Sequence, residues 1–141
     1  MDNTLPKNKL ILIGIMGAIA VSLGALGAHF LKSKLETGLI TTDQLNGFDT
    51  AVKYQMYHVL GMLVLVILNK LYPNKFFGWA YALFFWGIIL FSGSLYFLCT
   101  RNLLGAEWLK FLGPITPLGG VCFVLGWLSI CFAVLKTDKK A

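Results

Sequence analysis

The polar residues best suited to chemistry lie in one short stretch, Tyr54-Gln55-Met56-Tyr57-His58, at the start of an otherwise apolar run. Three positions separate Gln55 from His58, and Tyr54 precedes His58 by one helical turn, so a helix would carry all three on one face. An amide, an imidazole and a phenol all form hydrogen bonds, and a histidine can also relay protons. This stretch is therefore the first candidate for a binding or proton-handling site.

The composition decides what surrounds that helix. The chain has 141 residues, of which 57% are hydrophobic and 13% charged, with a mean hydropathy of +0.75. Soluble domains carry about 25% charged residues, so the sequence predicts an integral membrane protein with a single domain, 1–141. Polar groups facing lipid would cost about 2 kcal/mol or more. The Tyr54–His58 face is thus expected to look into the protein interior.

Four apolar stretches predict an all-α membrane protein, a bundle of four transmembrane helices with both termini on the same side. The approximate spans are residues 10–31, 52–72, 76–100 and 114–135. Residues 32–51 form a polar connection that includes the amphipathic start of the second helix, with Gly38 ending the first helix and Thr42 capping the second. A cleaved signal peptide is the alternative interpretation of the first stretch.

The basic residues indicate the orientation. The net charge is +6, and the basic residues lie between the apolar stretches, where topology and anionic headgroups use them. Seven of them fall on the side of the termini and five on the other side. This excess predicts that both termini are cytoplasmic. The lipid bilayer is the expected partner, a homo-oligomer is possible, and nucleic acid is not expected.

Each helix offers a polar side chain at a similar distance from the charges opposite the termini. At about 1.5 Å per residue, His29 lies about 5 Å, His58 about 8 Å, Thr116 about 9 Å and Ser94 about 10 Å from the nearest charge. Together these positions predict a pocket in the outer leaflet for a ligand. Its candidate residues are His29, Tyr54, Gln55, Tyr57, His58, Ser92, Ser94, Tyr96 and Thr116. The alternative is that these groups bond to one another and only fix the helix register.

Small residues predict where the first helix packs. Gly14 and Ala18 form one series at four-residue spacing, and Ala20, Gly24 and Ala28 form a second. Small side chains at this spacing allow another helix to approach closely.

Two prolines mark the start of the last helix. Pro114 and Pro117 predict either non-helical backbone beside a cavity or a helix that begins only at Pro117, with Thr116 as its N-cap.

No motif indicates an enzyme or a metal site. The sequence lacks a Gly-x-Ser-x-Gly elbow, a His-Glu-x-x-His motif and a Cys-x-x-Cys pair, and its acidic residues lie outside the predicted spans. Cys99, Cys122 and Cys131 are expected to be small packing residues. We therefore predict no catalytic residues, no metal ligands and no cofactor.

Four motifs resemble a known family. They are Gly24-Ala25-Leu26-Gly27-Ala28-His29, the stretch from Phe48 to His58, Phe91-Ser92-Gly93-Ser94-Leu95-Tyr96, and Ile115-Thr116-Pro117-Leu118-Gly119-Gly120 with Gly126-Trp127. In this order they are similar to the bacterial family called domain of unknown function 423, which the eukaryotic transmembrane protein 256 also resembles. The resemblance implies a multi-pass protein of the bacterial inner membrane with about four helices, and it implies no reaction.

Four functional hypotheses follow, one of which is an enzyme with His58 as base and a serine or tyrosine as nucleophile or acid. The first is a four-helix scaffold or a binder of a lipid or small amphiphile, with a polar pocket around His29 and His58. The second is an oligomeric transporter or proton conductor, which would need polar groups in the inner half of the bundle as well. The third is a membrane protein whose two histidines ligate a haem b from different helices.

Overall fold

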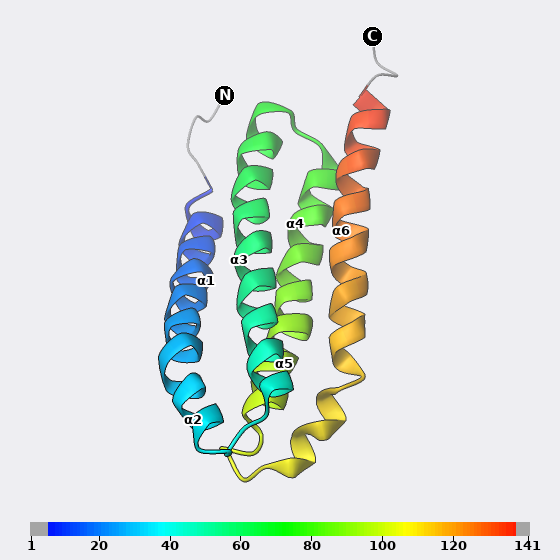
Figure 1. Ribbon diagram of the computed structural model, residues 1–141. Helices are drawn as coiled ribbons and strands as arrows, with labels where there is room; N and C mark the ends of the chain where they lie inside the picture. The colour runs from blue at the N-terminus through cyan, green and yellow to red at the C-terminus, as the bar shows by residue number, and fades with distance from the viewer. Residues whose placement is uncertain (1–5, 138–141) are drawn as a thin grey trace.

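In the computed structural model, which describes residues 6–137, the chain is a bundle of helices, and this part of the chain contains no strand (Figure 1). Four of its helical segments are long and apolar enough to cross a membrane. The predicted all-helical membrane fold is thereby confirmed. The elements are α1 (Lys7–Leu26), η1 (Gly27–Leu31), α2 (Lys32–Glu36), α3 (Thr42–Leu71), α4 (Lys75–Gly87), η2 (Ile88–Ser92), α5 (Gly93–Thr100), η3 (Glu107–Leu112) and α6 (Ile115–Thr137).

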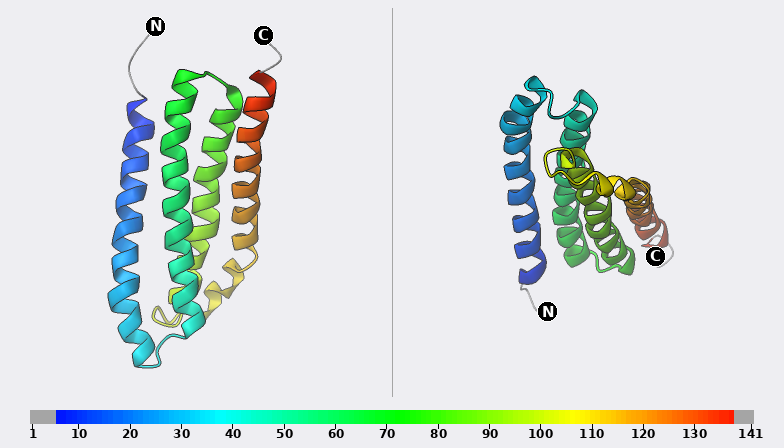
Figure 2. Two further views of the ribbon diagram at one scale, coloured as in Figure 1. Left: turned by 45° about the horizontal axis from the view of Figure 1, so that its top comes forward. Right: turned by 90° about the horizontal axis from the view of Figure 1, so that it is seen from below.

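The helices form an open row. The α1–η1–α2 rod packs on α3, α3 packs on the α4–η2–α5 rod, and that rod packs on α6. Seen along the bundle, α1 and α6 lie at opposite edges with α3 and α4 between them (Figure 2). The beginning of α1 and the end of α6 lie at the same end of the bundle. At that end the Lys9 ammonium lies 4.8 Å from the centre of the Tyr81 ring.

Local signals at the loops explain where the helices end and begin. Gly38 has a positive φ of 74°, which a glycine adopts without strain, and it ends the first rod as the sequence indicated. The cap of α3 is Thr41, so the prediction of Thr42 was wrong by one residue. The reason is a capping box: Gln44 N donates to Thr41 Oγ1 at 3.2 Å, and Thr41 N donates to Gln44 Oε1 at 2.9 Å.

The last helix begins after Pro114 and before Pro117. Helix α6 starts at Ile115, directly after Pro114, and Pro117 occupies its first turn. A proline there removes an N–H that has no partner within the helix, so it does not break the helix. The non-helical backbone is thus confined to residues before Ile115, and Thr116 lies inside the helix instead of capping it.

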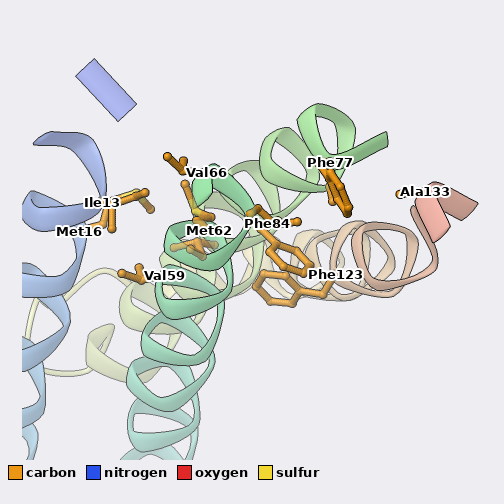
Figure 3. Close-up of a cluster of buried hydrophobic side chains, with 12 residues drawn as sticks. Ile13, Met16, Val59, Met62, Val66, Phe77, Phe84, Phe123 and Ala133 are labelled. Atoms are coloured by element: carbon orange, nitrogen blue, oxygen red, sulfur yellow. The ribbon is translucent and has the colours of Figure 1, made fainter. Parts of the chain in front are cut away.

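The main hydrophobic core runs across the row. Met62 on α3 and Phe84 on α4 are fully buried at its centre, with Met16 of α1 on one side and Phe123 of α6 on the other (Figure 3). A smaller core at the loop end includes Phe48, which packs beneath η1. Aromatic side chains fill the interfaces among α3, α4 and α6, whereas α1 contributes the smaller side chains Ile13 and Met16 to this core.

A glycine sets the closest approach between η2 and α6. A Cβ on Gly119 would lie 2.3 Å from the backbone nitrogen of Phe91, so the two backbones are in direct contact there. On α1, Ala20 is fully buried and Gly24 faces Val52 of α3. Gly14 and Ala18 are exposed, so the expected helix contact of these two residues is not made within one chain. The face of α1 that packs on α3 carries Ala20 and Gly24, and Gly14 and Ala18 lie on a different face of the helix.

Gly119→Ala should destabilise the protein by about 2 kcal/mol or more, because the added methyl meets backbone that cannot move aside. Unfolding in mixed detergent micelles measures the change in the free energy of unfolding. Gly120→Ala is the matched control, since its Cβ would lie 3.9 Å from the nearest atom, a carbon of the Phe91 ring. It should be neutral or stabilise by up to about 1 kcal/mol, the usual gain for alanine over glycine in a helix. Equal effects of the two variants would contradict the close contact.

Candidate functional site

The polar residues of α3 do not converge on one pocket. Gln55 and His58 are each 4% exposed, but Gln55 reaches α1 and α5, whereas His58 reaches α6. Positions three apart differ by about 60° around a helix axis. Because α3 lies inside an open row, that angle directs the two side chains into different interfaces. The prediction that they share one face toward one site is therefore wrong.

His58 is held by hydrogen bonds at both ring nitrogens. Its Nδ1 lies 2.7 Å from the carbonyl oxygen of Tyr54, which can only accept, so Nδ1 carries the proton. Its Nε2 accepts from Trp127 Nε1 at 3.2 Å. The ring is therefore a neutral imidazole with no nitrogen free for a metal, a ligand or a proton relay.

Aromatic rings enclose this histidine. The Phe123 ring stacks on it with centroids 3.5 Å apart and an interplanar angle of 10°, and the Phe84 ring meets it edge-on at 4.9 Å. An open groove of about 580 Å³ between α3 and α6 has Tyr54, Phe91 and Trp127 among its walls, with His58 at its base. Sequence reasoning missed these aromatic partners, although Trp127 belongs to the last family motif.

The amide of Gln55 joins three elements on the other side of α3. Its Nε2 donates to the carbonyl oxygen of Met16 on α1 at 2.8 Å. Its Oε1 accepts from the Tyr96 hydroxyl on α5, also at 2.8 Å. The Tyr96 ring packs on Phe48 with centroids 5.0 Å apart. This amide–phenol pair is a polar centre deep among apolar side chains.

A cavity of about 440 Å³ opens directly beside this pair, between α1 and α5. It contains no charged side chain, and its polar wall consists of Gln55, Ser94 and Tyr96. Its apolar wall consists of Met16, Ile19, Leu23, Ile88, Ile89, Gly93, Phe97, Leu112 and Ile115. The volume is within the range of about 300–1,000 Å³ that is typical of small-molecule sites.

The two serines of the third motif have separate partners. Ser92 is fully buried and donates to the carbonyl oxygen of Ala51 on α3 at 2.8 Å. Ser94 donates to the Phe91 carbonyl at 3.0 Å, so the 2.6 Å contact with Thr116 has the threonine as donor. Ser92 thus fixes the α3–η2 contact, and the Ser94–Thr116 bond ties α5 to the first turn of α6.

The remaining candidates lie apart from the cavity. Tyr57 is 57% exposed, and Tyr54 is partly exposed with its ring stacked on Phe91 at 4.8 Å. His29 is exposed in the η1 turn. These three side chains are not brought together with Gln55 and Tyr96.

The expected common depth of His29 and His58 is wrong. Gly17 faces Val59 and Gly27 faces Phe48, so His29 is level with residues near position 46 of α3. It therefore lies about 18 Å along the helices from His58. The error came from treating Lys32 and Lys53 as level with each other, whereas the Gly24–Val52 and Gly27–Phe48 contacts place Lys32 level with residues near position 43 of α3. Two histidines so far apart cannot ligate one haem iron. In the part of the chain that the structure describes, no group of three His, Cys, Asp or Glu residues could hold a metal ion.

His58→Ala should lower the free energy of unfolding by about 2–4 kcal/mol, because it leaves a hole beside Phe123 and an unpaired indole N–H on Trp127. Unfolding in mixed micelles tests this. His29→Ala, which removes an exposed ring, should change stability by less than about 0.5 kcal/mol. A small effect of His58→Ala would show that the enclosed ring is not structural.

The Gln55–Tyr96 bond should appear as a coupling energy. Tyr96→Phe and Gln55→Leu each remove one partner, so their effects on the free energy of unfolding should be less than additive in the double variant. The expected coupling is about 0.6–1.7 kcal/mol, the range for hydrogen bonds between membrane helices. Strict additivity would contradict the bond.

Comparison with known proteins identifies the family. A family model described as protein of unknown function (DUF423) matches residues 23–120. The UPF0382 membrane protein YwdK of Bacillus subtilis is 42% identical over 131 residues, covering 92% of this chain and 98% of the relative. A UPF0382 membrane protein of Staphylococcus epidermidis is 41% identical over 127 residues, covering 89% and 94%.

A more distant relative also matches over nearly the full length. The UPF0382 inner membrane protein YgdD of Escherichia coli is 32% identical over 131 residues, covering 93% of this chain and 92% of the relative. No solved structure gives a significant match. The resemblance seen in the four sequence motifs is thus confirmed, and the chain belongs to the DUF423 family of membrane proteins.

Proposed function

We propose that this membrane protein binds one neutral amphiphile in the cavity between α1 and α5. The observation that carries the proposal is the buried Gln55–Tyr96 pair at the wall of an otherwise apolar cavity of about 440 Å³. Small-molecule sites typically combine apolar walls with a few polar groups that fix the orientation of the ligand.

The lining favours an uncharged ligand with a hydrogen-bonding oxygen. No charged side chain lines the cavity, so a charged group there would be desolvated without a counter-ion. The Gln55 amide uses one N–H for Met16 and keeps another, and the Tyr96 oxygen can still accept. A quinone or the ester region of a lipid has the required apolar body and carbonyl oxygens.

The local backbone supports this choice. The cavity is bordered by Ile88 and Ile89 of η2, a π-helical turn between α4 and α5. Such turns are rare and occur frequently at functional sites. Gly93 follows this turn and lines the cavity without a side chain of its own.

For the cellular setting, we propose the bacterial inner membrane with both termini in the cytoplasm. In the sequence, seven basic residues fall in the segments on the side of the termini and five in the connections on the other side, and this excess supports the orientation. The name of the Escherichia coli relative supports the inner membrane. In this orientation the loops between α2 and α3 and between α5 and α6 face outward.

Gly93→Leu should abolish binding of a quinone probe. Its Cβ would meet no atom closer than 4.0 Å, so the new side chain can enter the cavity without a clash. We expect the affinity for decylubiquinone in nanodiscs, measured by ligand-observed NMR, to fall at least about tenfold, because the ligand must be displaced from its volume. Tyr96→Phe should weaken binding about fivefold, because the Gln55 amide that donates to the quinone carbonyl loses the bond that orients it.

Gly14→Leu is the matched control, because Gly14 is an exposed glycine of α1 with no atom within 4 Å of its added Cβ. It should leave the affinity unchanged. If the wild-type protein fails to bind the probe and carries no co-purified amphiphile in native mass spectrometry, the proposal is overturned. Equal effects of Gly93→Leu and Gly14→Leu on the affinity for the probe would also overturn the proposal.

A further inference from the structure

A second groove lies between the first rod and the outer half of α3. It has a volume of about 240 Å³ and is separate from the cavity beside Gln55. Its floor on the first rod is made by the small residues Gly24, Gly27 and Ala28, which face Phe48 and Val52. Its polar rim consists of Lys32, Asn46 and Asp49. Figure 1 shows the two helical segments that form it side by side.

The rim holds one lysine whose charge is not balanced by an ion pair. The Asp49 carboxylate is already paired with Lys53, whose Nζ lies 2.6 Å from Oδ2. Lys32 forms no ion pair within the described residues 6–137. Of the two charged residues of the rim, Asp49 is thus balanced by Lys53, and Lys32 has no ion-pair partner beside this groove. A monoanionic amphiphile would balance that charge.

These charges lie where the neighbouring surface is apolar. Gly24 faces Val52 and Gly27 faces Phe48, so the Asp49–Lys53 pair is level with residues 23–27 of the first rod. The exposed side chains of α1 at and next to this level include Leu26 and Val21. Further along α3 the exposed face is also apolar, with Leu60, Val64 and Ile67. An ion pair at this position needs polar surroundings that lipid tails do not supply.

We propose that this groove binds a phospholipid with an anionic headgroup, such as phosphatidylglycerol. The phosphodiester lies between the Lys32 ammonium and the Asp49–Lys53 pair, and Asn46 donates a hydrogen bond to it. Lys32 lies about 8 Å further out along the rod than Gly27, which is level with the pair, and a lysine side chain spans most of that distance. One acyl chain lies over Gly24, Gly27 and Ala28. This site is independent of the amphiphile cavity between α1 and α5.

The test is lipid selectivity in nanodiscs that contain equal amounts of phosphatidylglycerol and phosphatidylcholine with identical acyl chains. Lipids that remain bound after ejection from the nanodisc are counted by native mass spectrometry. We expect phosphatidylglycerol to be enriched about fivefold among them, the effect of about one unbalanced lysine near an anionic lipid. Lys32→Gln should remove this enrichment.

Lys34→Gln is the matched control for charge. Lys34 lies two residues away with its ammonium over the Phe30 ring, and it does not line the groove. Loss of either lysine changes the net charge equally, so a diffuse surface attraction would respond equally to both variants. We expect enrichment to survive in Lys34→Gln. Equal losses would overturn the proposal.

Ala28→Leu fills the groove without changing the charge and should also remove the enrichment. Ala25→Leu is its control, since Ala25 is exposed on the same rod and does not line this groove. Thermal unfolding shows whether each variant is folded. Retained enrichment in a folded Ala28→Leu protein would overturn the site.

Two further measurements distinguish this lipid site from a site for free phosphate and from the amphiphile cavity. Glycerol 3-phosphate at millimolar concentration should not displace the lipid, because it lacks the acyl chain that the groove holds; displacement would show a site for free phosphate instead. Gly93→Leu should abolish quinone binding while leaving phosphatidylglycerol enrichment intact, and Ala28→Leu should do the reverse. Failure of one proposal is thereby distinguished from failure of the other.

Discussion

Side chains that donate to backbone carbonyls of neighbouring helices hold the row together. Gln55 of α3 donates to Met16 of α1, and Ser92 of η2 donates to Ala51 of α3. Asn74, the cap of α4, donates to Ala133 of α6 at 3.0 Å. Each interface in the row therefore has one such bond. In lipid an unpaired polar group is costly, so these contacts determine which helix faces may meet.

Three hollows along α3 follow from the open arrangement. A closed square of four helices would bring α1 against α6 and leave α3 little exposed surface. In the observed row α3 instead borders the amphiphile cavity, the His58 groove and the groove beside Lys32. The row is densest where glycines let α4 and α6 touch, and it is loosest beside α1. Both proposed ligands lie against α1, where packing within the chain leaves space.

The fold class and the family were predictable from the sequence because they depend on hydropathy and on motif order. Gly38 was identifiable because a positive φ strongly favours glycine. The convergence of the candidate site was not predictable. Helical periodicity relates Gln55 to His58 but does not say which neighbour each side chain will meet. Of the nine candidate ligand residues, Gln55, Ser94 and Tyr96 line the cavity. These three residues meet there because of the order of the helices in the row, which the sequence does not give.

The Gln55–Met16 bond also has a consequence for how the protein is made. The first rod leaves the ribosome before α3, so the Met16 carbonyl is already in place when Gln55 arrives. An amide entering the bilayer on its own would have no partner, whereas one arriving beside a completed first helix can bond to it at once. Insertion of α3 next to α1 as a helical hairpin would give this amide its partner, and the order of synthesis matches the order of the row.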